Sequence, residues 1–407
     1  MPKMKKIRIN LLTRIIIAIA LGILLAPLMP VWAGMVFSTF SGIFGNFLGF
    51  SIPLIILGLV APAIGRIGAS AGRILLLTVA LAYGSTLFSG FFTYFTCDAV
   101  FPHLLTEGSI DEITQAPDAF PAYFGIAMPP LMEVMTALIL AFVLGIGFTA
   151  IKGTALLEAT EDFAGIINKL ISKVIIPVLP FYIFCIFLSM SASGQVAGIV
   201  KVFIKVIAVI FVLHVLLLFV QFTVAGLVSR RNPLKLLRTM LPAYATALGT
   251  QSSAATIPVT LEQTLKNGVS EPVARFVIPL CATIHLAGST MKITSCAMAI
   301  MIITGMPYDF GLFAGFIFML GVTMVAAPGV PGGAIMAALG VLQSMLGFNE
   351  TACALMIALY IAMDSFGTAC NVTGDGAIAV ITDRISRKKS NSEPDTGRND
   401  KNTAPAF

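Results

Sequence analysis

The sequence predicts an all-α polytopic membrane protein with eight transmembrane helices and two re-entrant helical hairpins. Its 407 residues are 57% hydrophobic and only 11% charged, whereas charged residues make up about a quarter of an ordinary soluble domain. Apolar runs of about 18 residues or more recur along the chain, and each is long enough as a helix to cross a bilayer core of about 30 Å. Two further apolar segments are interrupted by Gly, Ser or Pro, which predicts the hairpins.

The first half of the chain contains six predicted spans. More spans follow the first directly, so we expect an uncleaved helix there rather than a secretory signal. The fifth is a long helix that begins on an amphipathic stretch and ends at a turn of small residues. The approximate bounds are 15–28, 40–64, 74–94, 132–150, 156–190 and 199–228.

Basic residues indicate the orientation. Lys and Arg cluster at the N-terminus, at 66–73, at 230–235 and in the tail after 384, whereas the loop 98–118 has acidic residues and no Lys or Arg. Short basic segments are retained in the cytoplasm. Both termini of this cell-membrane protein are therefore expected to be cytoplasmic. The same distribution explains the net charge of +6 without a nucleic-acid partner. The six cysteines form no CxxC pair and are interpreted as buried thiols.

The second half contains the two hairpins. The segment 240–261 is broken by Gly249–Ser253, and the segment 312–346 is broken by Pro328–Gly333. Unwound backbone at membrane depth must be covered by protein or by a water-filled cavity, so each segment is predicted to re-enter. Spans at 273–304 and 351–382 follow the first and the second hairpin respectively.

Polar residues follow one face of the last span. Asn371 and Asp375 lie within about 20° of Asp364 around a helix, and Thr368 lies about 40° away. A carboxylate at the bilayer centre costs at least roughly 2.5 kcal/mol, so two on one face need counter-charges, protons or a bound cation. Lys292 is the only obvious intramembrane cation. Half-helix ends at the hairpin tips offer amides and carbonyls as further ligands.

Four motifs in order carry a resemblance: TQSSAATIPVTLE, PLCATIHLAGST, APGVPGGAI and DSFGTACNVTGDGA. They resemble the dicarboxylate/amino acid:cation symporter family, which includes the glutamate transporter homologues. The resemblance implies an elevator-type transporter fold and a homotrimer in the lipid bilayer. It implies a scaffold of residues 1–70 and 120–193 and a transport domain of residues 71–119 and 194–385. The transport domain would contain hairpins near 238–267 and 311–346, and 386–407 would be a polar cytoplasmic tail.

The resemblance also implies site residues. The implied substrate ligands are Ser252, Ser253, Ser289, Gly329, Val330, Asp364, Thr368 and Asn371, with Asp364 receiving the substrate ammonium. The implied sodium ligands are the side chains of Asn371 and Asp375 and the backbone carbonyls of Cys281 and His285.

Three departures from the family pattern bear on function. Gly367 stands where members that carry acidic amino acids have an arginine, which favours a neutral amino acid. Ala287 stands where the usual NMDGT motif has its aspartate, so fewer coupled sodium ions are expected. Lys292 is not typical of the family: it substitutes for the lost ion or neutralises Asp375, and both alternatives stay open. His285 is interpreted as a core histidine, with a proton-linked step as the alternative.

The sequence thus predicts a symporter that couples uptake of a neutral amino acid to a sodium gradient. The alternatives are a proton-coupled amino acid or dicarboxylate symporter and an anion-conducting channel. An intramembrane aspartyl protease is excluded, because eleven residues of helix separate Asp364 and Asp375 by about 16 Å, too far for a shared-proton pair. No enzyme activity and no cofactor besides the coupling ion are expected.

Overall fold

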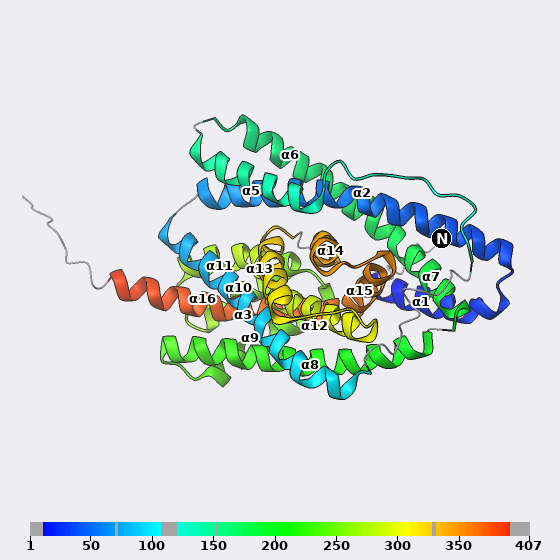
Figure 1. Ribbon diagram of the computed structural model, residues 1–407. Helices are drawn as coiled ribbons and strands as arrows, with labels where there is room; N and C mark the ends of the chain where they lie inside the picture. The colour runs from blue at the N-terminus through cyan, green and yellow to red at the C-terminus, as the bar shows by residue number, and fades with distance from the viewer. Residues whose placement is uncertain are drawn as a thin grey trace, which may run out of the picture.

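The computed structural model describes residues 11–69, 72–106, 120–151, 153–194, 196–327 and 331–390, and the regular structure in these ranges is helical. Most of the predicted acidic loop and the tail beyond residue 390 lie outside the described residues. The helices pack in two groups (Figure 1).

The first group contains helices from the N-terminal half. Figure 1 shows α2, α5 and α6 along one side of the molecule, with α1 and α7 together at one end. The extensive contacts are α2 with α5 and α6, and α1 with α7. The bounds are α1 Leu11–Leu25, the 3₁₀ turn η1 Ala26–Leu28, α2 Val31–Ala69, α5 Val134–Ala150, α6 Ala155–Leu170, the π-helical turn η2 Ile171–Ile175 and α7 Ile176–Ala192.

The second group contains α3 and all helices from α8 onward. It touches the first group chiefly where α13 and α14 meet α2 and where α15 meets α1. The bounds are α3 Arg73–Leu104, α8 Val196–Ser229, α9 Pro233–Thr250, α10 Ser253–Lys266, α11 Glu271–Ile284, α12 Ala287–Ile303, α13 Phe310–Ala326, α14 Gly333–Leu346, α15 Glu350–Ala362 and α16 Asp364–Ser390.

Several of the predicted spans are present as long apolar helices. Among the described residues, six helical segments are long and apolar enough to cross a membrane, and the bent pair α15–α16 makes a seventh. The fourth predicted span, α5, has 17 residues and is shorter than these. The structure therefore shows an all-helical protein with several apolar helices, while the count of eight spans stays a prediction.

Two spans that the sequence predicts as continuous are broken. The span at 273–304 is divided by His285 and Leu286 into α11 and α12, and the span at 351–382 bends by 62° at Met363 between α15 and α16. Apolar periodicity does not register such breaks, because both halves of each span stay buried.

The two segments predicted as hairpins contain pairs of contacting helices, α9 with α10 and α13 with α14, while their re-entry into the membrane stays a prediction. At the first tip, the Ser252 hydroxyl accepts a hydrogen bond from Ala255 N (3.3 Å) and so caps α10. The serine that interrupts the apolar pattern therefore also starts the next helix.

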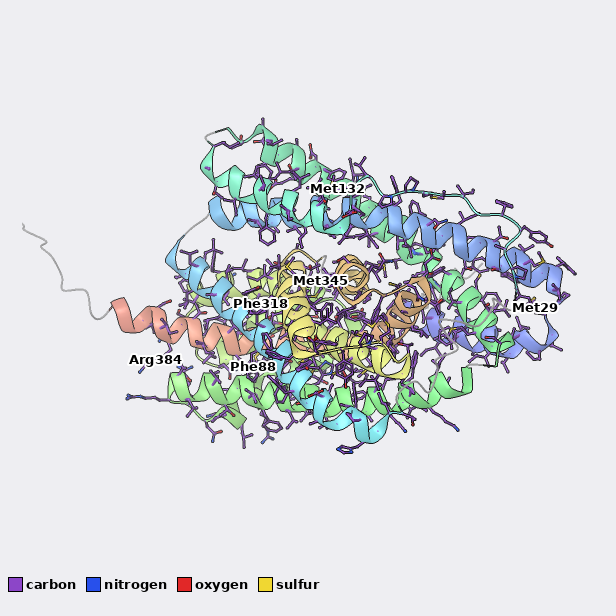
Figure 2. All side chains as sticks on the ribbon, in the orientation of Figure 1. Met29, Phe88, Met132, Phe318, Met345 and Arg384 are labelled. Atoms are coloured by element: carbon purple, nitrogen blue, oxygen red, sulfur yellow. The ribbon has the colours of Figure 1, made fainter. Side chains whose placement is uncertain are left out.

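Helix α12 lies at the centre of the second group, because all of its residues are buried. It contacts α3, α8, α15 and α16. Figure 2 shows Met29 and Arg384 at opposite ends of the molecule. Because α12 is buried along its whole length, its side chains and those of α16 that face it lie away from the surface of the protein.

Candidate functional site

The predicted polar residues meet where α16 packs against the break between α11 and α12. Three hydrogen bonds join the two segments: His285 bonds Asp375, Gly288 bonds Asn371, and Lys292 bonds Asp364. The residue numbers rise along α12 while those of the partners fall along α16. The packing is therefore antiparallel, and it places one buried charge pair on each side of Asn371.

Asn371 and Ser289 form the centre of the site. The Asn371 Oδ1 atom accepts from Gly288 N (2.8 Å), and its Nδ2 donates to Ser289 Oγ (3.1 Å). The Tyr360 hydroxyl also donates to Ser289 Oγ (3.0 Å). The serine oxygen thus receives two hydrogen bonds, which leaves its own hydrogen to donate.

Asp364 forms the first charge pair. Its Oδ1 lies 3.3 Å from Nζ of Lys292, and its Oδ2 accepts from Gly332 N (2.8 Å) at the tip between α13 and α14. The Lys292 ammonium also reaches Met363 O (3.4 Å) and lies 3.6 Å from the centre of the Tyr360 ring. The sequence left open a pair between Lys292 and Asp375, and the structure pairs Lys292 with Asp364 instead.

Asp375 forms the second charge pair, with His285. The Nδ1 atom of His285 lies 2.8 Å from Asp375 Oδ1, and both side chains are fully buried. Because a carboxylate only accepts, Nδ1 carries the hydrogen, and in the neutral ring Nε2 accepts from the Ser85 hydroxyl (3.1 Å). Gln221 Nε2 donates to the same hydroxyl (3.0 Å). A chain of polar groups from α3 and α8 therefore holds the imidazole on the carboxylate.

Three of the four groups predicted to bind sodium already meet protein donors. Cys281 O accepts from His285 N (2.9 Å), and Asn371 Oδ1 and Asp375 Oδ1 are bonded as described above. No cluster of three or more His, Cys, Asp or Glu side chains suited to a metal occurs in the described ranges. The His285 ring therefore lies against one oxygen of the carboxylate that is predicted to bind the ion.

Two glycines of α16 make room for neighbouring side chains of the site. A Cβ atom on Gly367 would lie 2.5 Å from Nζ of Lys292, and one on Gly374 would lie 2.7 Å from Oε1 of Gln221 and 2.8 Å from Cε1 of His285. Atoms cannot approach this closely without a shift. The sequence suggested that Gly367 leaves an empty space where relatives carry an arginine, and the structure fills that space with Lys292.

The hairpin residues are placed less directly. Helix α10, which begins after Ser252, packs against α16, and Ser253 on α10 and Thr368 on α16 are both buried. The second tip reaches Asp364 through Gly332. Gly329 and Val330 lie outside the described residues, so their predicted role as substrate ligands stays a prediction.

A comparison with known protein families shows the family of this chain. A profile of the sodium:dicarboxylate symporter family matches residues 11–385. The chain belongs to the sodium:dicarboxylate symporter family. This confirms the resemblance that the four motifs carry, and with it a membrane transporter rather than a soluble domain.

Individual relatives share only a quarter to a third of the aligned residues with this chain. The chain is 31% identical to an uncharacterized symporter of Haemophilus influenzae over 63% of this chain and 59% of that protein. It is 33% identical to excitatory amino acid transporter 5 of Mus musculus over 40% of this chain and 29% of that protein. It is 25% identical to the serine/threonine transporter SstT of Acinetobacter baylyi over 94% of this chain and 98% of that protein. The match thus spans less than two thirds of the first two relatives.

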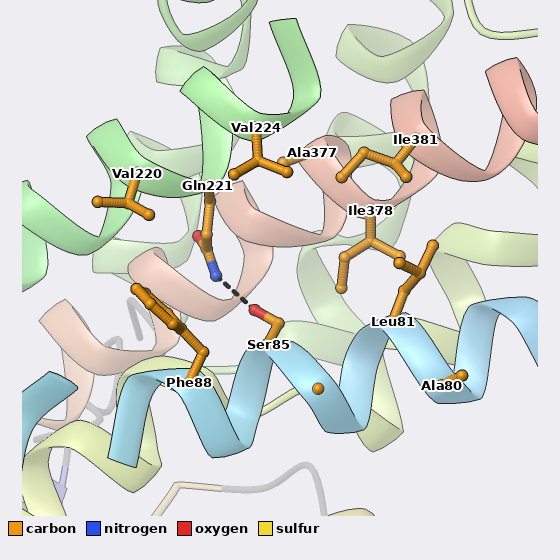
Figure 3. A pocket seen from close by; sticks show the side chains of 11 residues that line it. Ala80, Leu81, Ser85, Phe88, Val220, Gln221, Val224, Ala377, Ile378 and Ile381 are labelled. Atoms are coloured by element: carbon orange, nitrogen blue, oxygen red, sulfur yellow. Dashed lines mark hydrogen bonds between the residues drawn. The ribbon is translucent and has the colours of Figure 1, made fainter. Parts of the chain in front are cut away.

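A cavity lies apart from the charge pairs of this symporter-family protein. It measures about 260 Å³ and lies between α3, α8 and α16, where Ala80, Leu81, Phe88, Val220, Val224, Ala377, Ile378 and Ile381 supply apolar walls (Figure 3). Ser85 and Gln221 are its polar side chains, and Figure 3 shows the hydrogen bond between them. Asp364 and Lys292 do not line it. Ser85 lines the cavity and also bonds His285, so it links the cavity wall to the site.

Sequence reasoning missed three residues of the site. Tyr360 bonds Ser289 and faces Lys292, and Ser85 and Gln221 hold His285. Gly332, which donates to Asp364, lies in the Pro328–Gly333 interruption, whose amides the sequence offered as ligands. Tyr360 lies four residues before Asp364, so the helical spacing of the last span is a signal that could have found it. Ser85 and Gln221 stand alone in apolar helices, and nothing in the sequence pattern connects them to His285.

Proposed function

We propose that this protein is a secondary active symporter that couples uptake of a neutral amino acid to a sodium gradient. The family supports a sodium-coupled symporter of amino acids or dicarboxylates. The observation that carries the amino-acid assignment is Asp364, a buried carboxylate at the contact of α16, α12 and the second hairpin tip. A buried anion of this kind matches a ligand ammonium.

The preference for a neutral substrate has two supports. Gly367 provides no side chain on α16 that could bind a second carboxylate of the substrate. The relative that this chain matches along most of its length is named a serine/threonine transporter. Substrate would lie among Asp364, Asn371, Thr368, Ser289 and the two hairpin tips, including Ser252, Ser253, Gly329 and Val330.

The arrangement of the helices in two groups supports a proposal for the transport movement. We propose that α1, α2 and α5–α7 form the scaffold of a homotrimer and that α3 and α8–α16 move past it as an elevator. The support is that the site lies wholly within the second group, with α12 buried at its centre. Both termini would be cytoplasmic.

Sodium is proposed to bind at Asp375 and Asn371 after the His285 ring leaves Asp375. A carboxylate, an amide oxygen and backbone carbonyls are hard oxygen ligands suited to such an ion. The hydrogen bond between His285 and Asp375 favours a second candidate, a proton-coupled amino acid symporter, because histidine is the side chain whose charge changes near neutral pH.

Purified protein in proteoliposomes separates these functions. A panel of radiolabelled amino acids and dicarboxylates is offered with sodium, proton or potassium gradients imposed one at a time. We expect uphill uptake of neutral amino acids under an inward sodium gradient only. Uptake driven by protons and indifferent to sodium would favour the second candidate, and no uphill uptake of any amino acid would contradict the proposed function.

A further inference from the structure

Lys292 is one of the largest fully buried side chains of the protein. Its ammonium has three neighbours: the Asp364 carboxylate, the Met363 carbonyl and the face of the Tyr360 ring. A buried cation without a partner is strongly destabilising. These contacts therefore explain how the ammonium is tolerated, but they do not explain why a cation is placed beside the site.

The contacts of Lys292 are long. Its distances to Asp364 Oδ1 and Met363 O are 3.3 and 3.4 Å, whereas hydrogen bonds between charged N–H and O⁻ groups are typically about 2.7–2.9 Å. Asp364 is held more closely by Gly332 N, at 2.8 Å. The carboxylate is thus fixed by the hairpin tip, while the ammonium is joined to it loosely.

The backbone of α16 gives the ammonium its place. Gly367 is one helical turn after Asp364, so the two residues lie close together on the helix surface. Because Gly367 has no Cβ, the end of the Lys292 side chain lies directly against the helix. The site therefore presents an anion and a cation side by side, next to the point where Gly332, between α13 and α14, bonds Asp364.

We propose that Lys292 is the residue that binds the substrate carboxylate. A zwitterionic α-amino acid opens the pair between Lys292 and Asp364, its ammonium takes Asp364, and its carboxylate takes Lys292. This assignment rests on the proposed function, which it deepens by naming the charge pattern of the substrate.

The charge balance of the buried site selects a zwitterion. Opening the pair leaves one positive and one negative group buried without a partner, and each must be matched. An amino acid with an uncharged side chain matches both. A carboxylate without an amine leaves Asp364 unmatched, an amine without a carboxylate leaves Lys292 unmatched, and an acidic amino acid brings one anion too many.

Three ligands of similar size test the assignment on purified protein in detergent. They are L-serine, serinol, in which the carboxylate is replaced by a hydroxymethyl group, and glycerate, in which the ammonium is replaced by a hydroxyl group. Affinity is measured from the rise of the thermal unfolding midpoint with ligand concentration. In the unsubstituted protein we expect serine to bind about 10- to 100-fold more tightly than serinol or glycerate, the range for a hydrogen bond between charged groups.

The decisive variant is Lys292→Met, which keeps the length of the side chain and removes its charge. We expect the preference for serine over serinol to fall to about two-fold, the scatter between independent sites, while the preference over glycerate remains. Lys205→Met is the matched control, because Lys205 is exposed on α8 and donates to Leu104 O away from the site. A full serine preference over serinol in Lys292→Met would overturn the assignment.

A second variant covers the case in which Lys292→Met fails to fold because Asp364 is left unpaired. Lys292→Met combined with Asp364→Asn removes both charges together. We expect this variant to fold and to bind the three ligands with affinities that differ by about two-fold or less. A strong serine preference in it would overturn the role of Lys292. If the unsubstituted protein binds no amino acid at all, the proposed function fails instead.

Discussion

Replacing His285 with Ala is predicted to lower the sodium concentration that half-maximal uptake requires. The imidazole bonds Asp375 at 2.8 Å, and both side chains are buried, so a sodium ion bound at Asp375 as proposed would compete with the ring. Ala has no polar side-chain atom that could hold that contact, whereas Asn would keep an amide group at the place of Nδ1. The substitution therefore removes the competitor without adding a charge.

The expected change in sodium requirement follows from the hydrogen bond that is lost between His285 and Asp375. A hydrogen bond to a charged group contributes about 1.5–3 kcal/mol, and about 1.4 kcal/mol corresponds to a ten-fold change in an equilibrium constant. Freeing Asp375 should lower the sodium concentration for half-maximal uptake by roughly 10- to 100-fold. The bonds from Ser85 to His285 and from Gln221 to Ser85 help hold the ring, so Ser85→Ala should shift the same quantity in the same direction by less.

The assay is uptake of radiolabelled L-serine into proteoliposomes at increasing external sodium, with choline keeping the ionic strength constant. His214→Ala is the matched control, because His214 is a buried histidine of α8 that bonds Gly288 O (3.3 Å) and not Asp375. An unchanged or higher sodium requirement in His285→Ala, with normal insertion and folding, would refute the competition between ring and ion.

Three other predictions concern α16. Asp364→Asn should abolish amino-acid uptake while the protein still inserts, because the substrate ammonium loses about 3 kcal/mol or more of stabilisation; near-native apparent affinity in transport assays would contradict this role. Gly367→Arg should lower neutral amino-acid uptake, since Lys292 fills the space against Gly367; unchanged serine uptake by the folded variant would count against that packing. Gly374→Ala should press on Gln221 and on the His285 ring and reduce the sodium requirement by less than His285→Ala does, and an increase measured in the same sodium titration would argue against it.

The sequence by itself determined the class of protein. Composition and apolar runs require a membrane environment, because a chain with 57% hydrophobic residues has too little polar surface for water. The interruptions at Gly249–Ser253 and Pro328–Gly333 predicted the paired helices α9–α10 and α13–α14. The spacing of Asp364, Thr368, Asn371 and Asp375 correctly predicted that they share one helix, since helical periodicity is a local property.

Only the tertiary structure decided which charges are paired. Lys292 is 72 residues from Asp364 and His285 is 90 residues from Asp375, and the sequence pattern cannot choose between partners at such separations. The choice depends on the antiparallel register of α16 against α11 and α12, which is set by side-chain packing and by the room at Gly367 and Gly374. Pairing at a distance is therefore a result of packing, whereas the helices and their polar face follow from local sequence.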